Sequence, residues 1–507
     1  MTPRLLACLT GMTLLAAVPL ASAVSADTPA AGKGVDKAAE KPAGEKGDLP
    51  PLPADRTVRQ SAVIGGRTIA YDATVGTISV RDEKDKTIGQ VVYTAYVVPG
   101  RDPGRPVTFA FNGGPGASSV YLNMGAIGPK RVQFGAQGDA PSDAPIARDN
   151  ADSWLDFTDM VFIDPVGTGF SRSLLDADAT KKAFYANEPD IKYLSRIVYD
   201  WLVRNERLRS PKYVIGESYG GYRAPRIAYE LQTQLGVGVN GLVMVSPYLD
   251  PAATGDGTAL SPLPWMIDLP SMAAGNLERQ GRLTPAAMAD VEAYTRGEFV
   301  TDLLRGPKDP AATGRLVQRV ATLTGLDPDL VRKMDGRIDA GTYLREVHRK
   351  DKQLGSVYDS NVTAWDPFPG APDQRAGDPI LDALIAPTTS AMVDFITRVV
   401  GWKVDARYNA LSYAVNNAWD RGAPRDSPVT DLRKAIAIDP KMGVLIAHGY
   451  DDLSCPFFGS RLIVDQMPTF GEAQRVKLSV YPGGHMFYSR PASAAAFKAD
   501  ARALYRR

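Results

Sequence analysis

The segment GESYGG (216–221) holds a serine in a setting that can make it a nucleophile. Gly216-Glu217-Ser218-Tyr219-Gly220 matches the pattern G-x-S-x-G, follows the apolar run KYVI and precedes a stretch typical of a helix. A tight turn from strand to helix, with glycines on both sides, would expose the serine hydroxyl near a helix N-terminus, which stabilises negative charge. The pattern alone is common by chance, so its position between a predicted strand and a predicted helix makes Ser218 the candidate nucleophile.

A serine at its own pKa is a poor nucleophile and needs a base, and the chain has three histidines: His348, His448 and His485. In enzymes with this serine turn, the acid and then the histidine follow along the chain. His485, in PGGHMF after the last apolar run, meets that order and can return to the serine on a loop. We expect His348, in the charged stretch REVHRK, to be a solvated surface residue. His448 ends the run VLIAH, and we expect a structural histidine beside the site.

The acid that orients the histidine is one of two neighbouring aspartates. Asp451 and Asp452 follow the predicted strand VLIAHGY, where a loop at the sheet edge can present a carboxylate to His485. Their spacing from the strand does not choose between them. The other aspartate is expected to be solvated or to cap a turn.

These residues need a sheet to position them, and short buried-strand runs supply one. The runs with helical stretches between them are VTFAF (107–111), MVFID (160–164), KYVIG (212–216), GLVMVSPYL (241–249), MGVLIAHG (442–449) and VKLSVYPGG (476–484). Alternation of buried strands and helices indicates a mostly parallel central sheet with helices on both faces, an α/β-hydrolase fold. The strand pattern stops between about 250 and 410, where the sequence is mainly helical and polar. We therefore predict two core parts, 56–250 and 411–507, separated by a helical cap insertion, 251–410.

Five separated blocks of the chain resemble the serine carboxypeptidase family, in particular its bacterial branch. The blocks, in chain order, are FNGGPGASS (111–119), DPVGTGFS (164–171), GESYGG (216–221), GYDDLSCP (449–456) and GGHM (483–486). The resemblance covers most of residues 60–507. It implies the same fold and an activity that releases C-terminal amino acids from peptides.

The resemblance also implies roles for single residues. The acid block selects Asp452 over Asp451, and the oxyanion donors would be the backbone amides of Gly114 and Tyr219. Asn112 and Glu217 would hold the substrate's terminal carboxylate, and Cys455 and Met486 are candidates for the substrate pocket.

One departure affects this assignment. Many relatives carry a second glutamate where this chain has Ala126. Without that neighbour, Glu217 loses a partner that shares its proton. A glutamate donates to a carboxylate only when it is protonated. An acidic pH optimum for the exopeptidase activity is therefore not implied by the resemblance alone.

The predicted function is a secreted serine-type carboxypeptidase acting on peptide substrates through Ser218, His485 and Asp452 and an acyl-enzyme. No metal or cofactor is expected, because the sequence shows neither zinc-type ligand spacing nor a phosphate-cradling loop. One alternative is an esterase or acyltransferase with the same triad, which has no use for a carboxylate clamp. A second is an inactive hydrolase fold used for binding, which the intact triad residues disfavour.

Bulk properties set the remaining expectations. A net charge of +1 over 507 residues gives no reason to expect a nucleic-acid partner. Residues 1–26 have a basic start, a short apolar run and a small-x-small site, which predicts a cleaved signal peptide and export to the periplasm or the medium. Residues 27–55 are rich in Ala, Pro and Lys and predict a disordered leader. After cleavage Cys455 is the one remaining cysteine, so no intramolecular disulfide is expected; neither is a membrane span, and the oligomeric state is left open.

Overall fold

The computed structural model describes residues 49–506, apart from gaps at 101, 133–141, 143–145, 250–260, 373, 423–426 and 472–474. The predicted signal peptide, 1–26, lies outside the described residues, as does most of the predicted leader, 27–55.

The chain starts with three antiparallel strands, β1 (Arg56–Ile64), β2 (Arg67–Arg81) and β3 (Thr87–Val97). Two glycines, Gly65 and Gly66, connect β1 to β2, and both have positive φ, at 53° and 77°. A two-residue hairpin turn of this kind needs positive φ at both positions, which glycine adopts without steric cost. β3 then pairs antiparallel with the first strand of the parallel part, so this meander extends the central sheet.

Six parallel strands continue the central sheet, in the order β7-β4-β9-β10-β13-β14, and the short strand β8 (Arg172–Ser173) pairs antiparallel with β3. Their bounds are β4 Val107–Phe111, β7 Asp159–Ile163, β9 Lys212–Glu217, β10 Gly241–Val245, β13 Gly443–Gly449 and β14 Val476–Tyr481. The strands inside the sheet are buried along their whole length, as expected for strands covered on both faces. The mostly parallel sheet predicted from the apolar runs is therefore present.

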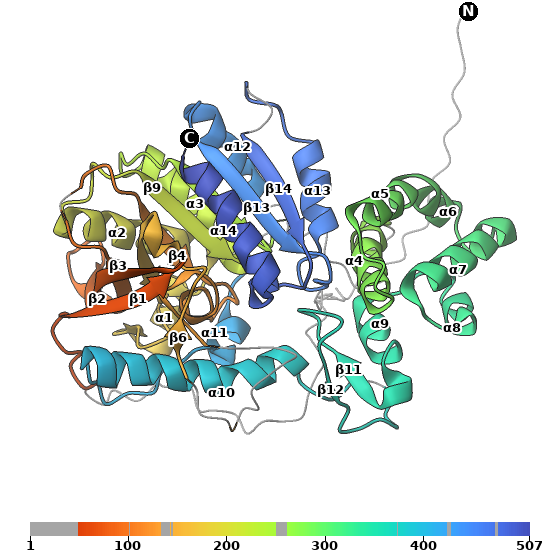
Figure 1. Ribbon diagram of the computed structural model, residues 1–507, viewed down its shortest axis with the longest axis horizontal. Coiled ribbons are helices and arrows are strands. Elements are labelled where there is room, and N and C mark those ends of the chain that lie inside the picture. Colours follow the sequence, from red (N-terminus) through yellow and green to blue (C-terminus); the bar gives the residue numbers. More distant parts are fainter. Residues whose placement is uncertain are drawn as a thin grey trace, which may run out of the picture.

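Helices cover both faces of the sheet (Figure 1). Along β9, Val214 belongs to one hydrophobic core and Tyr213 and Ile215 to the other, because successive side chains of a strand point to opposite faces. The first core packs against α2 (Asn187–Arg204), α3 (Tyr219–Thr233) and α12 (Pro428–Ile438). The second packs against α10 (Pro379–Asp394), the π-helix η6 (Phe395–Val400) and α14 (Pro491–Tyr505).

The predicted insertion, 251–410, divides into two parts. Its first helices form a separate lobe beside the sheet, seen in green in Figure 1. They are α4 Leu263–Arg279, α5 Pro285–Tyr294, α6 Val300–Arg305, α7 Pro310–Thr324, α8 Pro328–Lys333 and α9 Ala340–Glu346. The lobe has its own hydrophobic core, which Leu453, Phe457 and Phe458 of the main body join. A small hairpin, β11 (Gln353–Gly355) with β12 (Thr363–Trp365), follows the lobe. The last part, α10 with η6, belongs to the core of the main body instead.

Short elements complete the described chain. They are β5 Lys130–Arg131, β6 Arg148–Asp149, β8 Arg172–Ser173, α1 Ala177–Phe184, α11 Tyr413–Ala418, α13 Phe457–Asp465, and the short helices η1 Leu122–Ile127, η2 Trp154–Asp156, η4 Thr295–Phe299, η5 Arg349–Asp351 and η7 Phe487–Ser489.

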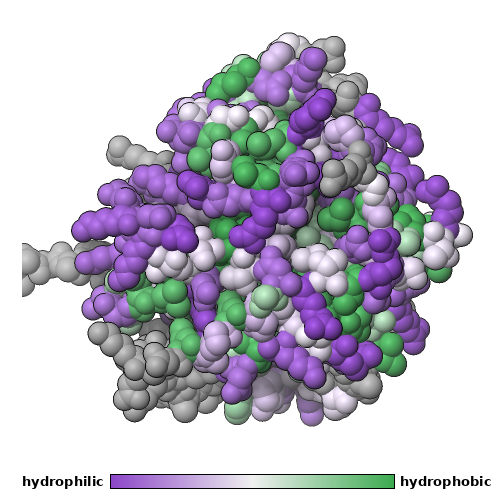
Figure 2. Space-filling model, turned by 90° about the vertical axis from the view of Figure 1, so that its left-hand side faces the viewer, coloured by the Kyte–Doolittle hydropathy of each residue, from purple (hydrophilic) through white to green (hydrophobic). Residues whose placement is uncertain are grey.

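One helical stretch in the described part of the chain, Pro379–Val400, is long and apolar enough to cross a membrane by length and composition. Its residues Ile380, Leu384 and Phe395 lie in the core beside the sheet, and the Phe395 ring is 6.0 Å from that of Tyr96. These contacts are those of a core helix. On the face shown in Figure 2, hydrophilic side chains predominate and hydrophobic ones form separate small patches.

Candidate active site

Ser218 lies in the turn between β9 and α3 with a strained backbone, φ 60° and ψ −121°. Positive φ is uncommon for a residue with a side chain and marks stored strain. The glycines around it leave no room for a side chain: a Cβ on Gly216 would lie 1.8 Å from the carbonyl oxygen of Gly220, and one on Gly220 would lie 2.2 Å from that of Phe111. The sequence motif therefore folds into the turn that it predicts, at the carboxyl end of a central strand.

His485 and Asp452 meet at the carboxyl ends of two further strands, after β14 and β13. His485 Nδ1 lies 2.8 Å from Asp452 Oδ2, and both side chains are buried. The other carboxylate oxygen, Oδ1, accepts from the backbone amides of Ser454 and Cys455 at 2.8 and 2.9 Å. Burial opposes a charged imidazole, but the carboxylate of Asp452 outweighs it and raises the pKa of His485. This pair has the form of a base held by an acid.

A loop of the insertion also holds the histidine. His485 donates its backbone N–H to the carbonyl oxygen of Tyr358 at 2.5 Å, and the two rings lie edge to face with centroids 5.2 Å apart. Gly484 allows this approach, because a Cβ there would lie 1.9 Å from the Tyr358 carbonyl oxygen. Sequence reasoning missed Tyr358, since it belongs to the segment between β11 and β12, far from the motifs.

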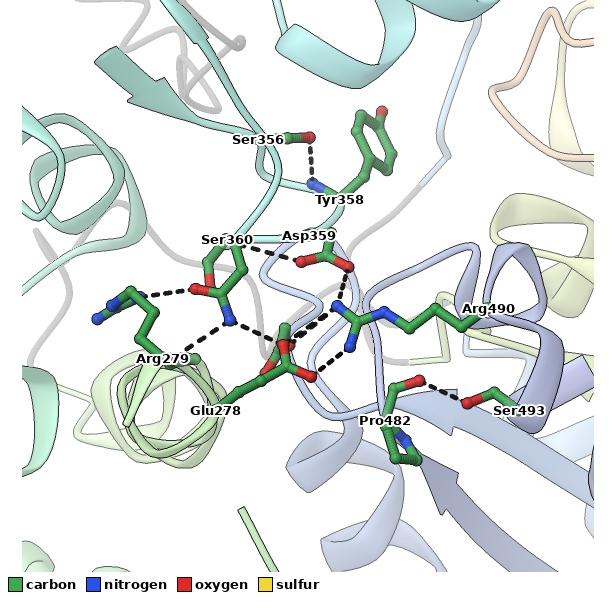
Figure 3. Close-up of polar contacts among 12 residues, drawn as sticks. Glu278, Arg279, Ser356, Tyr358, Asp359, Ser360, Pro482, Arg490 and Ser493 are labelled. Atoms are coloured by element: carbon green, nitrogen blue, oxygen red, sulfur yellow. Dashed lines mark hydrogen bonds and ion pairs between the residues drawn. The ribbon is translucent and has the colours of Figure 1, made fainter. Parts of the chain in front are cut away.

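Asp451 is not solvated and caps no turn, contrary to the prediction for the second aspartate. Its side chain is fully buried and lies near Glu278 from α4, Asp359 from the β11–β12 loop and the guanidinium of Arg490. Figure 3 shows Glu278 and Asp359 directed toward that guanidinium. Arg490 Nη2 lies 2.8 Å from Asp359 and 3.1 Å from Glu278, but 3.6 Å from Asp451. We call Glu278, Asp359, Asp451 and Arg490 the acid cluster.

The acid cluster brings three carboxyl groups to one guanidinium. Burial and a hydrogen bond to Glu278 raise the pKa of Asp451 well above its usual range. Burial opposes ionisation of Glu278 too, but its hydrogen bonds to Asp451 and Arg490 outweigh this and lower its pKa to about 2. Asp451 is therefore the protonated member, because one cation cannot compensate three buried anions.

Of the other two histidines, His448 lies as predicted and His348 does not. His448 is buried, its Nε2 lies 2.8 Å from Ser460 Oγ, and burial lowers its pKa to about 4. This is the structural histidine predicted beside the site. The prediction for His348 is wrong: it is buried, and its Nε2 lies 2.9 Å from the carbonyl oxygen of Ser360. The fold covers the charged stretch REVHRK on its histidine side, which the local sequence does not reveal.

The glycine loop 112–116 lies against the serine turn. A Cβ on Gly113 would lie 2.4 Å from the backbone nitrogen of Tyr219, and Gly114 has φ +97°. Only glycine allows so close an approach of two backbone segments. The two predicted oxyanion amides, those of Gly114 and Tyr219, thus lie on adjoining segments.

Two buried groups hold this loop. Arg223 donates Nη1–H to the carbonyl oxygen of Asn112 at 2.8 Å and is itself fixed by Asp190, whose Oδ2 lies 2.6 Å from its Nε. On the other side, Asp164 accepts from the backbone N–H of Ser119 at 2.8 Å, and burial raises its pKa to about 7. The block DPVGTGFS therefore contributes a support for the loop.

The predicted carboxylate-binding pair is assembled next to the nucleophile. Asn112 donates Nδ2–H to Glu217 Oε2 at 2.9 Å, and its Oδ1 accepts from the backbone N–H of Leu122 at 2.9 Å. Tyr488 adds a contact that sequence reasoning missed: its hydroxyl lies 2.9 Å from both Oε1 and Oε2 of Glu217. Glu217 is buried, and this burial raises its pKa despite the two donors.

The remaining predicted residues lie around the same point. Ala126 is buried in η1, within the core that also contains Tyr488. Cys455 is buried, which raises the pKa of its thiol, and its sulfur forms a hydrogen bond with the side chain of Ser218. Met486 directly follows His485 and is buried. Among the described residues, no group of three or more His, Cys, Asp or Glu side chains is arranged to hold a metal ion.

Comparison with known proteins gives the following similarities. The sequence profile of the serine carboxypeptidase family matches residues 74–259. The pheromone-processing carboxypeptidase KEX1 of Yarrowia lipolytica is 33% identical over 150 residues, which are 29% of this chain and 22% of that protein. The vitellogenic carboxypeptidase of Aedes aegypti is 29% identical over 150 residues, 29% of each chain. These matches thus span less than a third of either relative.

A solved structure is similar over most of the chain. The prohormone-processing carboxypeptidase Kex1(delta)p of Saccharomyces cerevisiae superposes with a TM-score of 0.55 at 14% identity, covering 86% of this chain and 91% of that one. At this identity the similarity concerns the fold, and the α/β-hydrolase fold predicted from the strand pattern is confirmed.

Proposed function

We propose that this chain, a member of the serine carboxypeptidase family by its match over residues 74–259, is a serine-type carboxypeptidase that releases C-terminal amino acids from peptides. The observation that carries the proposal is the position of Glu217. This buried carboxyl group directly precedes the candidate nucleophile and has Asn112 beside it. A hydrolase that ignores the end of its substrate has no use for such a pair.

In the proposed acylation step, Ser218 Oγ attacks the carbonyl carbon of the last peptide bond while His485 accepts the hydroxyl proton. The oxyanion of the tetrahedral intermediate is stabilised by the backbone amides of Gly114 and Tyr219. His485 then donates the proton to the leaving amine, the C–N bond breaks, and the C-terminal amino acid departs.

In the proposed deacylation step, His485 takes a proton from water, which attacks the ester of Ser218. The acid is released and the serine regains its proton. Asp452 accepts the Nδ1 hydrogen bond of His485 throughout and stabilises the imidazolium that forms in each step. The raised pKa of His485 supports this role.

Glu217 and Asn112 would bind the terminal carboxylate of the substrate. A protonated Glu217 donates to that carboxylate, whereas an ionised one repels it. Burial raises the pKa of Glu217, so the protonated form persists to higher pH than for an exposed glutamate. We therefore expect exopeptidase activity to be strongest in acid and to decline as pH rises.

The test compares a blocked dipeptide that has a free C-terminus with its C-terminal amide, across pH 4 to 8. The free acid should have the higher kcat/KM at low pH, and its advantage should shrink as Glu217 ionises. Equal rates on both substrates at every pH would refute the exopeptidase function while leaving a general hydrolase, such as the esterase alternative. Ser218→Ala serves as the inactive control.

The predicted signal peptide, 1–26, would take the enzyme out of the cytoplasm, to the periplasm or the medium. Mass spectrometry of the mature N-terminus after expression in a bacterial host tests this. A chain that still begins at Met1 in the cytoplasmic fraction contradicts it.

A further inference from the structure

The inference concerns Tyr488 and rests on the proposed function. The Tyr488 side chain is 1% exposed and comes from η7, three residues after His485. Its hydroxyl lies 2.9 Å from both carboxyl oxygens of Glu217, so the phenol oxygen is equally distant from the two. We propose that Tyr488 is a positioning residue for recognition of the C-terminal carboxylate and that it acts through Glu217.

The first step of the argument is the direction of the phenol proton. Of the described residues, the acceptors in contact with the Tyr488 hydroxyl are the two oxygens of Glu217. A phenol has one proton, so that proton remains in the bond to Glu217. Burial and the neighbouring Glu217 raise the pKa of Tyr488. The phenol therefore keeps its proton and remains the hydrogen-bond donor to Glu217.

The second step of the argument is the direction of the Glu217 proton. Tyr488 and Asn112 both donate to its oxygens, and Asn112 Nδ2 lies 2.9 Å from Oε2. When Glu217 is protonated, its own O–H cannot point at either donor without losing a hydrogen bond. The proton is therefore directed away from both, toward a third group. A substrate carboxylate is an acceptor that fits this position.

This arrangement differs in kind from a pair of acids. Two carboxyl groups that share one proton keep it between them, and they titrate as a pair. With a tyrosine as partner, Glu217 titrates as a single group whose proton is free for the ligand. The other titratable groups around Glu217 are His485, which lowers its pKa, and Asp452, which raises it, with Tyr121 and Cys455 nearby.

The experiment measures kcat/KM and KM for the blocked dipeptide acid and amide between pH 4 and 8, in the unchanged enzyme and in Tyr488→Phe. This substitution removes one oxygen atom and preserves the ring packing. The ratio of acid to amide kcat/KM should fall at least about tenfold, through KM of the acid, because the hydrogen bond that directs the Glu217 proton toward the substrate carboxylate is lost. The pH at which the ratio declines should move upward, since Tyr488 favours ionised Glu217.

Tyr71→Phe is the matched control. It removes a buried hydroxyl from the same hydrophobic core, and that hydroxyl has no hydrogen-bond partner among the described residues. It should leave the ratio and its pH dependence unchanged. If Tyr488→Phe lowers activity on both substrates equally, or changes nothing, the inference is overturned and Tyr488 is part of the packing.

A second variant keeps the test decisive if Tyr488→Phe does not fold. Glu217→Gln places an amide N–H at the site at every pH, so the acid-to-amide ratio should lose its pH dependence between 4 and 8. Retained pH dependence overturns the inference. Failure of the proposed function gives a different result, because the unchanged enzyme would then fail to discriminate acid from amide.

Discussion

Asp451 and Asp452 are adjacent in the chain and both side chains are fully buried, yet their surroundings are opposite. Asp452 accepts two backbone N–H groups and faces His485, so each oxygen of its carboxylate has a donor. The side-chain carboxyl of Asp451 has no N–H or O–H donating to it among the described residues, and the nearby cation, Arg490, is already shared by Glu278 and Asp359.

The contrast shows that burial alone does not determine the protonation state of a carboxyl group. A buried carboxylate with enough donors remains an anion and can orient a base. A buried carboxyl without them favours its protonated form, and burial and the neighbouring acids raise the pKa of Asp451. The surroundings of Asp452 suit catalysis. Those of Asp451 connect the insertion to the main body, because Glu278 belongs to α4 and Asp359 to the β11–β12 loop.

The largest expected effect is a difference in kcat between the Asp452→Asn and Asp451→Asn variants. Asp452→Asn should lower kcat by about 10⁴-fold, because the amide no longer fixes the histidine tautomer or stabilises the imidazolium. Asp451→Asn should keep activity within a few-fold at acidic pH, since an asparagine side chain can replace the protonated acid as donor. Steady-state kinetics at pH 5 on the blocked dipeptide measures both. The reverse ranking would mean that Asp451 is the acid of the triad.

A smaller effect is expected from Arg490, the cation of the acid cluster. Arg490→Gln leaves Glu278 and Asp359 without their shared partner and should lower the free energy of unfolding by about 2 kcal/mol, less than the cost of breaking a fully buried ion pair from one side, because Arg490 and Glu278 are partly exposed. Urea unfolding monitored by fluorescence measures this change. Arg398→Gln, which removes an exposed ion pair with Asp394, is the control and should leave the free energy of unfolding almost unchanged. Similar losses in the two variants would show that the acid cluster does not stabilise the fold.

The smallest effect is a pH dependence of stability that Asp451 causes. Its pKa in the folded state is raised above the unfolded value, so it contributes no penalty at low pH, and folded stability is lost as pH rises toward the folded pKa. The groups facing it are Glu278, Asp359, Arg490 and Tyr343. Asp451→Asn should therefore flatten, by several degrees, the decline of Tm that begins as pH rises above the unfolded value of 3.8.

Glu278→Gln provides the mirror-image control for this pH dependence. The folded pKa of Glu278 is about 2, below its unfolded value of 4.5, so its contribution is present above pH 4.5 and is lost as pH falls toward 2. This variant should change the Tm profile below pH 4.5, whereas Asp451→Asn changes it as pH rises above 3.8. Identical profiles for the two variants would contradict the assignment of the proton to Asp451.

Much of the architecture follows from local sequence patterns. The run VTFAF is β4 to the residue, the apolar runs predict the mostly parallel sheet, and the glycine motif predicts the turn at Ser218. Each depends on neighbours in sequence: apolar runs for buried strands, and glycines where the backbone passes at under 3 Å from a side-chain position. His348 and Asp451 were predicted wrongly because their surroundings come from segments far away in the chain.

The sequence by itself determined the chemistry on offer: a serine in a glycine turn, one histidine in the right order, and two adjacent aspartates after a strand. The tertiary structure decided which electrostatic environment each group has. It surrounded Asp452 with donors and Asp451 with other acids, and it brought Tyr488 to Glu217. The physical reason is that charge and hydrogen-bond energies depend on distance in space, and only the packed fold sets those distances.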